Sequence, residues 1–297
     1  SAEGGITWSG TSVANIRLET EDLSSLTISD VYYHELTVAT GSQVTTVMSG
    51  DIMLNPSLFT IPVIVTDGLV LHLDAGDISS YSGTGATWSD LGTYSYDATL
   101  ENGATFSGSA GGSTASIVFD GTDDRAYTSD NLMSALGVFS GTDNDVAYSM
   151  ECVFIAHSLG GSATNAMSLM GHASSLGIGI QLDGGGGNNN INFGYRTNSN
   201  TTFAYNFSLN TIYHIVCTRP SGGASVTITL YVNGVSEDTA SNDLRVDYTT
   251  AQFQLGDAET RIANLDGEIL MARVYNKALS LAEVEQNFNA TKNRFGL

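Results

Sequence analysis

Three carboxylates lie close together in the sequence, at Asp120, Asp123 and Asp124. Hard carboxylate oxygens on one loop are ligands that Ca²⁺ prefers, so this turn is the first candidate for a metal site. Asp74 and Asp77 form a second, smaller pair of the same kind. The alternative for both groups is a solvated acidic turn whose side chains accept hydrogen bonds from nearby backbone amides. The spacing matches no calcium-loop template such as the EF-hand, which favours the acidic turn. No cofactor is required, and Ca²⁺ is the only candidate.

Three tyrosines are the aromatic residues best placed to contact a ligand. Tyr81, Tyr94 and Tyr96 fall in predicted loops at one end of the domain, next to Asp and Asn residues. An exposed aromatic ring in such a setting can stack on a sugar, and it can equally pack against another subunit. We therefore predict a carbohydrate or partner contact at these tyrosines.

The sequence shows no arrangement of residues that is typical of nucleophilic catalysis. No grouping of Ser, His and Asp suggests a catalytic triad around any of the five histidines. The two cysteines, Cys152 and Cys217, each fall inside a strand-like run with no Cys or His at metal-ligand spacing. This placement favours two buried free thiols over a disulfide.

The composition sets limits on the possible partners. Only 14% of the 297 residues are charged, and 31 acidic residues against 10 basic ones give a net charge of −21. This charge repels phosphate backbones and anionic membrane surfaces, which argues against nucleic acid as a partner. No apolar run reaches the ~20 residues that span a bilayer, so no membrane insertion is expected. No signal-peptide pattern opens the chain, and whether Ser1 follows a removed Met or a removed leader stays open.

The periodicity of the apolar residues predicts an all-β protein. Apolar residues alternate with polar ones over 178–182, 191–195 and 226–232. Such alternation buries one face of a strand and leaves the other in water, as in antiparallel sheets. Asn233-Gly234 predicts a type I′ hairpin turn, because both positions favour positive φ.

One helix is expected, and it lies at the C-terminus. Ser280 and Glu283 form a Ser-x-x-Glu capping box, with Leu279 and Val284 at the flanking staple positions. Many strands and one terminal helix favour a sandwich over a βαβ fold.

Residues 1–66 have a different pattern and form a separate, small β segment. Short strand-like runs alternate with polar turns, and Pro56 and Pro62 bracket an extended stretch before a junction near Asp67. A unit of this size cannot build a large core and exposes apolar surface when alone. We therefore expect residues 1–66 to serve docking or oligomerisation, and residues 67–297 to fold independently. A homo-oligomer is the expected outcome.

Residues 67–297 resemble the laminin-G-like, concanavalin-A-like jelly-roll family. The resemblance rests on several short motifs in the family's order: Gly68–Ala75 (GLVLHLDA), Trp88–Asp90 (WSD), Asp97–Leu100 (DATL), Phe119–Asp124 (FDGTDD), Leu230–Gly234 (LYVNG), Phe253–Gly256 (FQLG), Asp266–Ile269 (DGEI) and Val274–Ser280 (VYNKALS). The loop between the second and third of these motifs departs from the Gly- and Asn-rich family pattern. The resemblance implies an antiparallel jelly-roll sandwich with structural roles for His72 and His214. It does not extend to residues 1–66.

The resemblance also bears on activity. Glucanases of this fold carry a Glu-x-Asp-x-x-Glu strand that places nucleophile and acid on one face, and this sequence contains no such strand. Glu268 stands at a scaffold position of the family. We therefore expect a protein without enzymatic activity.

Two functions are compatible with these expectations. The first is a virion structural protein, a bacteriophage capsid decoration or tail-fibre protein on the virion surface, because the chain looks like domains displayed on phage particles. Its partners would be capsid or tail proteins and further copies of itself, with a host-surface glycan as an additional ligand. The second is a secreted or surface lectin-like module in the extracellular space that binds carbohydrate, with or without Ca²⁺.

Overall fold

The chain divides into two compact units, Ser1–Ile61 and Pro62–Leu297. In the first unit, the computed structural model describes only two hairpins: β1 (Ile6–Trp8) with β2 (Ala14–Ile16), and β3 (Val31–Thr40) with β4 (Gln43–Met53). In the second, it describes residues 63–297 apart from 129–131, 139–144, 160–165, 173–177, 185–188, 195–200, 224, 243–251 and 258–263.

The boundary between the units lies earlier than the sequence suggested. Residues 63–66 were expected to belong to the N-terminal segment, but they belong to the second unit. Val65 is buried there, and its backbone N–H donates to Asn287 Oδ1 over 2.7 Å. The carbonyl of Val63 accepts from Gln286 Nε2 over 2.8 Å. These bonds to the C-terminal helix tie the segment to the sandwich.

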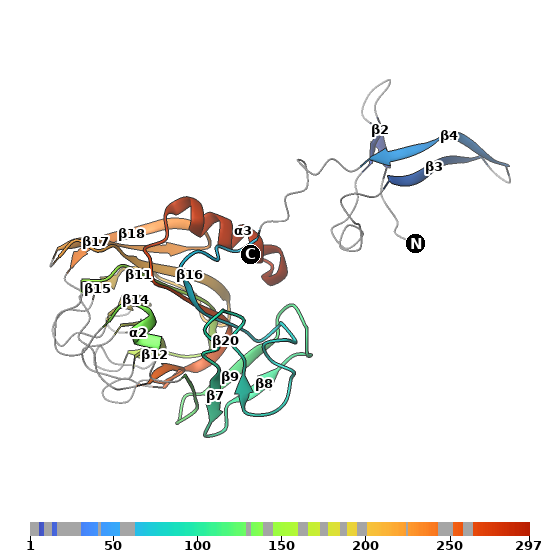
Figure 1. Cartoon of the computed structure of the whole chain (residues 1–297). Coiled ribbons are helices and arrows are strands. Elements are labelled where there is room, and N and C mark those ends of the chain that lie inside the picture. Colours follow the sequence, from blue (N-terminus) through green and yellow to red (C-terminus); the bar gives the residue numbers. More distant parts are fainter. Residues whose placement is uncertain are drawn as a thin grey trace. The chain divides into compact units, whose positions relative to one another are not determined.

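The second unit is a sandwich of two antiparallel sheets, as expected (Figure 1). We call one the helix-side sheet, with the order β18 (Val235–Asn242), β17 (Val226–Val232), β16 (Ile212–Arg219), β11 (Tyr148–Ala156), β20 (Asp266–Tyr275), β9 (Ser116–Asp120) and β8 (Thr105–Ser107); β5 (Leu69–Asp74) also pairs with β20. The opposite sheet has the order β15 (Thr201–Phe203), β14 (Asn190–Phe193), β13 (Gly179–Asp183), β12 (Met167–His172), β19 (Phe253–Leu255), β10 (Arg125–Tyr127), β7 (Ala98–Glu101) and β6 (Thr87–Trp88).

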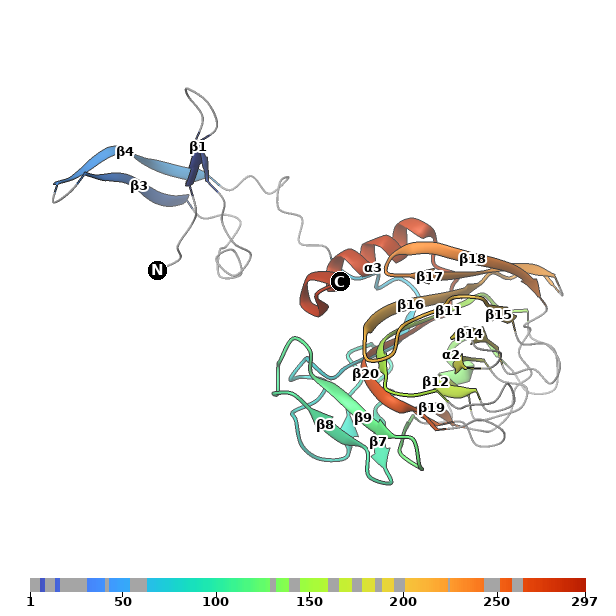
Figure 2. The same cartoon turned by 180° about the vertical axis from the view of Figure 1, so that it is seen from behind.

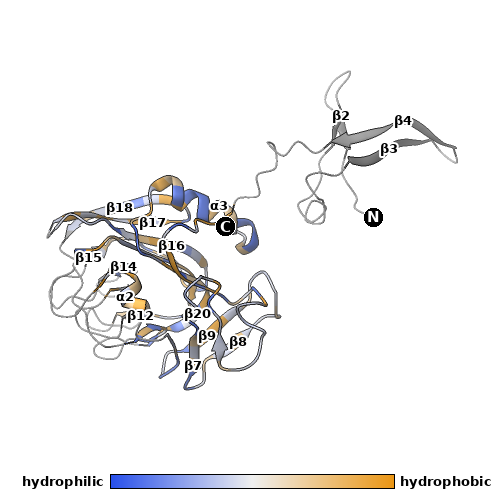
Figure 3. Cartoon of the chain, in the orientation of Figure 1, coloured by the Kyte–Doolittle hydropathy of each residue, from blue (hydrophilic) through white to orange (hydrophobic). Residues whose placement is uncertain are grey.

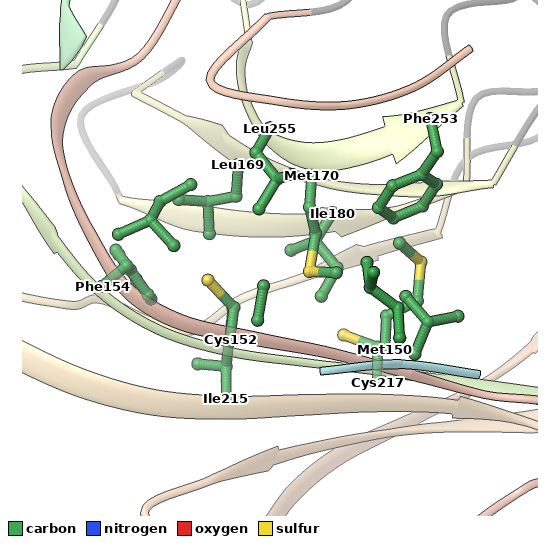
Figure 4. Packing of buried hydrophobic residues seen from close by; sticks show 14 of the residues in the cluster. Met150, Cys152, Phe154, Leu169, Met170, Ile180, Ile215, Cys217, Phe253 and Leu255 are labelled. Carbon is green, nitrogen blue, oxygen red and sulfur yellow. The ribbon is translucent and has the colours of Figure 1, made fainter. Parts of the chain in front are cut away.

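The two sheets enclose one large apolar core. Figure 4 shows side chains from both sheets meeting in it, among them Phe154 and Ile215 from the helix-side sheet and Ile180 and Leu255 from the opposite sheet. A short helix, α2 (Leu132–Ala135), adds Leu132 and Met133 to the same core. Burial of this apolar surface supplies the main driving force for folding.

Both cysteines contribute to the core as small apolar groups. Cys152 and Cys217 are buried and free, and their sulfur atoms lie among aliphatic and aromatic side chains (Figure 4). Burial raises the pKa of both thiols, so neither has thiolate character at neutral pH.

The C-terminal helix, α3 (Leu281–Phe295), lies along the outer surface of the helix-side sheet, where Figures 1 and 2 both place it beside β17 and β18. The expected capping box is present: Ser280 Oγ accepts from the Glu283 N–H, and Glu283 Oε2 accepts from the Ser280 N–H. Gly296 ends the helix in the left-handed conformation, with φ 71°. The helix carries both hydrophilic and hydrophobic residues, as Figure 3 shows, because only one side of it is buried.

The turn between β17 and β18 also agrees with the sequence. Asn233 and Gly234 both have positive φ, 49° and 78°, which a type I′ hairpin requires. A side chain at Gly234 would collide with Phe288 of α3, since a Cβ atom there would lie 2.6 Å from the ring. Glycine therefore serves both the turn and the close approach of the helix.

A buried polar network joins α3 to the sheet. Glu151 on β11 is fully buried, and its Oε1 accepts from His214 Nε2 and from Arg273 Nη1, each over 2.8 Å. Its Oε2 accepts from Asn287 Nδ2 of the helix over 2.7 Å. Asn287 Nδ2 also donates to Tyr275 Oη over 2.9 Å. The structural role expected for His214 is therefore present.

Replacing Glu151 by Ala should strongly destabilise the sandwich. The substitution leaves Arg273 without its carboxylate in a site that water does not reach, and it removes an acceptor from His214 and Asn287. Loss of one partner of a buried ion pair costs about 3–5 kcal/mol. Urea unfolding followed by circular dichroism measures the loss, and Glu285→Gln, at an exposed position of the same helix, is the charge-matched control. A variant as stable as the control would contradict this account.

Acid should weaken the fold through the same carboxylate. Burial alone would raise the pKa of Glu151, but the Arg273 charge and the bonds from His214 and Asn287 outweigh it and lower the pKa to about 2. The pKa of a Glu side chain in the unfolded chain is about 4.3. The stabilisation is therefore complete above that pH, and it is lost as the pH falls through the pKa of the folded state. We expect the free energy of unfolding to decrease between about pH 4 and about pH 2, and to decrease less in Glu151→Gln. Parallel pH curves for the two proteins would refute this assignment.

Candidate functional site

The acidic turn after β9 brings three predicted carboxylates together. One oxygen from each of Asp120, Asp123 and Asp124 lies within 4.8 Å of the others, and these are the described residues that could hold a metal ion. Asp120 and Asp123 are exposed, whereas Asp124 is buried. Two hydrogen bonds shape the turn: the Asp120 N–H donates to Asp124 Oδ2 over 2.9 Å, and the Thr122 N–H donates to Asp120 Oδ1 over 2.8 Å. Backbone amides thus bond to one oxygen of Asp120 and one of Asp124, as the acidic-turn alternative expects, and a cation at this turn stays a prediction.

In the second candidate pair, both carboxylates accept hydrogen bonds from the chain itself. Asp74 makes a bidentate ion pair with Arg294 of α3, with both N–O distances at 2.5 Å. Burial alone would raise the pKa of Asp74, but the Arg294 guanidinium outweighs it and lowers the pKa. Asp77 Oδ1 accepts from the Ser79 N–H over 2.8 Å. An arginine 220 residues away neutralises Asp74, so this pair matches the favoured alternative of side chains engaged within the fold.

Tyr94 and Tyr96 form a stacked pair between β6 and β7. Their rings are nearly parallel, 5° apart, with centroids separated by 5.4 Å. Tyr94 is 47% exposed, whereas Tyr96 is half-buried and packs against the core. Burial first, and then the neighbouring Tyr94 and Asp90, raise the pKa of Tyr96, so it remains a neutral phenol. The pair therefore exposes the ring of Tyr94 to solvent, and Tyr96, which packs against the core, supports that ring from below.

Asp90 holds the loop that carries this pair. Its Oδ1 accepts from the N–H groups of His72 and Gly92, each over 2.8 Å, and its Oδ2 accepts from the Tyr96 N–H over 3.0 Å. The backbone N–H of Asp90 in turn donates to Asp97 Oδ1 over 2.9 Å. The Asp90 carboxylate therefore accepts the backbone hydrogen bonds that a neighbouring strand would accept in a sheet. These bonds fix the position of the tyrosines.

Tyr81 does not belong to the ligand-contacting group that the sequence predicted. It is only 4% exposed, its hydroxyl donates to the carbonyl of Gly85 over 2.8 Å, and its ring packs 5.3 Å from that of Phe106. Tyr81 is a core residue beneath the loop, whereas a carbohydrate or partner contact at Tyr94 and Tyr96 stays a prediction.

A row of polar side chains on the opposite sheet was not singled out from the sequence. Ser168, Gln181 and Asn192 are register partners on β12, β13 and β14, and they alternate with core residues, so they point away from the core. Asn192 and, on β19, Gln254 are only 3% and 1% exposed, and their amide oxygens accept no hydrogen bond from any residue that the structure describes. For Gln181 and Asn192, the alternation correctly set the side on which they lie, but the expectation that this face is wet was wrong, since both are buried.

A second polar group missed by the sequence analysis surrounds Glu268. Its Oε1 lies 3.1 Å from His157 Nε2, and its Oε2 accepts from Ser116 Oγ over 2.5 Å. Asp266, two residues away on β20, accepts from Ser158 Oγ over 2.5 Å. In the described part of the chain, both serines donate to carboxylates and not to His157, which differs from the Ser–His order of a catalytic triad. Two features could have predicted this polar group: the pairing of β20 with its neighbouring strands, and the two-residue spacing that places Asp266 and Glu268 on one side of β20.

Comparison with known proteins decides the family. A laminin G family model, described as the concanavalin A-like lectin/glucanases superfamily, matches residues 120–285, which is more than half of the chain. The chain belongs to this superfamily. The resemblance inferred from the motifs is thereby confirmed for the domain family, whereas the resemblance to phage proteins is not shown. A search of curated protein sequences gives no match.

Solved structures share the fold of this lectin-like domain at low sequence identity. Domain 4 of AbnA, a GH43 extracellular arabinanase from Geobacillus stearothermophilus solved with arabinotriose, is 17% identical with a TM-score of 0.52, covering 75% of this chain and 99% of that one. A Trypanosoma rangeli sialidase mutant with trans-sialidase activity is 16% identical with a TM-score of 0.53, covering 79% of this chain but 35% of the sialidase. The binding domain of Botulinum neurotoxin DC, solved with rat synaptotagmin II, is 12% identical with a TM-score of 0.53, covering 76% and 52%.

No helix among the described residues combines the length and the apolar composition that crossing a membrane demands.

Replacing Asp90 by Ala should loosen the Tyr94 loop of the lectin-like domain. Three backbone N–H groups lose their acceptor, and an unsatisfied buried donor costs about 1–3 kcal/mol. We expect lower stability in urea and faster proteolytic cleavage between residues 89 and 97 than in the Glu285→Gln control. Unchanged cleavage in this segment would show that Asp90 does not hold the loop.

Proposed function

We propose that the sandwich is a non-enzymatic, lectin-like carbohydrate-binding module, and that Tyr94 is the platform on which a sugar ring stacks. The observation that carries this proposal is the exposed Tyr94 ring, which is stacked on Tyr96 and held by the Asp90 bonds. The apolar C–H face of a sugar packs on an aromatic ring, and a preformed platform lowers the entropy lost on binding.

The groups around Tyr94 suit a ligand that donates hydrogen bonds. Asp97 is exposed and uses one carboxylate oxygen for the Asp90 N–H, so further acceptor positions face solvent beside the tyrosines. Sugar hydroxyls can donate to such acceptors. A carboxylated or sulfated glycan would be repelled by Asp97 and by the net charge of −21. The proposed ligand is therefore an uncharged glycan.

The relatives support binding as the general activity of this fold. The arabinanase domain was solved with arabinotriose, and the toxin domain with the protein synaptotagmin II. These ligands belong to those proteins, and fold similarity alone assigns none of them here. Absence of catalysis is supported by the state of Glu268, whose two oxygens are engaged by His157 and Ser116.

The virion role stays a prediction, because neither the family match nor the structural relatives point to a virus particle. An extracellular location is proposed together with the lectin-like function, since the arabinanase relative is an extracellular enzyme. The docking role of residues 1–66 and the homo-oligomer also stay predictions.

The proposal is tested by glycan binding to Tyr94 variants. The full chain is screened against neutral and acidic glycans, and the dissociation constant of the best neutral ligand is then measured by calorimetry. Tyr94→Ala should weaken binding about tenfold or more, which corresponds to about 1.4 kcal/mol, because the stacking surface is lost. Tyr94→Phe keeps the ring and should bind nearly as the wild type does.

Leu209→Ala, which shortens another exposed apolar side chain, is the matched surface control. The proposal fails if no glycan binds, if acidic glycans are preferred, or if Tyr94→Ala and Leu209→Ala bind equally well.

A further inference from the structure

Two Asn-Gly pairs lie in turns of the sandwich, Asn102-Gly103 between β7 and β8 and Asn233-Gly234 between β17 and β18. Such a pair can deamidate spontaneously. The backbone nitrogen of the glycine attacks the Asn side-chain carbon Cγ, the amide nitrogen leaves as ammonia, and a succinimide ring forms. Water then opens the ring to aspartate or isoaspartate. Glycine favours ring closure because it has no side chain to hinder the approach.

The backbone of the two turns does not distinguish the pairs. Asn102 and Gly103 have φ 63° and 123°, and Asn233 and Gly234 have φ 49° and 78°. All four residues therefore have the positive φ that a tight turn of this kind requires. Any difference in reactivity between the pairs must come from what surrounds each turn.

The fold protects Asn233. Its side-chain Oδ1 accepts from the His214 N–H over 3.0 Å, and its backbone N–H donates to the carbonyl of His214 over 2.8 Å. Gly234 is buried beneath Phe288 of α3. Ring closure would break the Oδ1 bond beneath the helix, so it requires local opening of the structure first.

Asn102 has no such protection. Asn102 and Gly103 are both exposed. Among the described residues, the Asn102 side chain makes one hydrogen bond, from Nδ2 to the carbonyl of Asp123 over 2.9 Å. Water can replace an exposed bond of this kind at little net cost, so Cγ can turn towards the Gly103 nitrogen without any opening of the fold.

The fold also requires the glycine that makes the pair reactive. Gly103 has φ 123°, and a Cβ atom there would lie 3.0 Å from Asp124 Oδ1. A larger residue would be strained and would press on a buried carboxylate. We infer that Asn102 is a site of spontaneous deamidation, and that its conversion loosens the turn after β9.

The loosening follows from the chemistry of the product. A carboxylate at position 102 cannot donate to the carbonyl of Asp123, so the bond between the two turns is lost. The new negative charge also lies beside an already acidic turn, where like charges repel. Isoaspartate adds a further change, because the backbone then runs through the former side chain and the turn becomes one CH₂ group longer.

The reaction is tested by ageing the full chain at mildly alkaline pH, in native buffer and, in parallel, in urea. Samples are digested at acidic pH, and mass spectrometry follows the replacement of NH₂ by OH at each Asn. In native buffer, Asn102 should deamidate about tenfold faster than Asn233 or more, because only Asn233 requires local opening. In urea, where the fold is lost, the two rates should agree within about threefold.

Asn233 is thus the matched control within the same molecule. The inference is overturned if Asn102 reacts as slowly as Asn233 in native buffer. It also fails if the difference between the two persists in urea, since the local sequence and not the fold would then set the rates.

Asn102→Gly tests the consequence for the turn. Glycine accepts the positive φ and has no amide to lose, so ageing should leave the thermal midpoint of this variant unchanged. The wild type should unfold at a lower temperature after ageing than before. An aged wild type that keeps its midpoint, or an equal loss in Asn102→Gly, would show that Asn102 conversion does not loosen the turn.

Discussion

A carboxylate removed from water needs close compensation, and in this sandwich the compensation of Glu151 connects three strands and the helix. Arg273 lies on β20, His214 on β16 and Asn287 on α3, so the three donors reach Glu151 from different elements. A buried ion pair contributes little net stability compared with apolar packing, but the loss of one partner is costly. The network ties α3 to the sheet at one position, and through the Val65–Asn287 bond it extends to the start of the sandwich.

This arrangement determines which surfaces remain for binding. The helix covers part of the helix-side sheet, so that face is occupied by the chain itself. The exposed features lie instead on connections: Tyr94 between β6 and β7, and the acidic turn between β9 and β10. Both are held by hydrogen bonds to neighbouring segments and not by apolar packing alone. Loops on a rigid scaffold are where binding residues usually occur, because they can vary without disturbing the core.

Most of the fold could be predicted because its signals are local. Period-two alternation, the Asn233-Gly234 turn and the Ser280–Glu283 capping box each depend on a few neighbouring residues, and each appears in the structure. The site was predicted less well because burial depends on distant contacts. Tyr81 and Tyr94 look alike in the sequence, yet Phe106 covers one and leaves the other exposed.

The same limit applies to the charged and amide side chains. Nothing near Asp74 indicates that Arg294 will neutralise it, since the two residues are 220 positions apart. For Asn192, the pattern gave the correct side of the strand but not its burial. Sequence periodicity reports the direction of a side chain, whereas its partner and its exposure arise from the tertiary fold.

The distribution of charge links the structure to its proposed ligands. The structure describes six basic side chains; five form ion pairs with carboxylates, and the sixth, Lys292, lies over the ring of Phe288. In this part of the chain, positive charge is thus used to hold the fold together. The unpaired charge on the described surface is therefore mainly acidic, and a ligand there must be neutral or cationic to avoid repulsion. The uncharged glycan proposed at Tyr94 meets this condition.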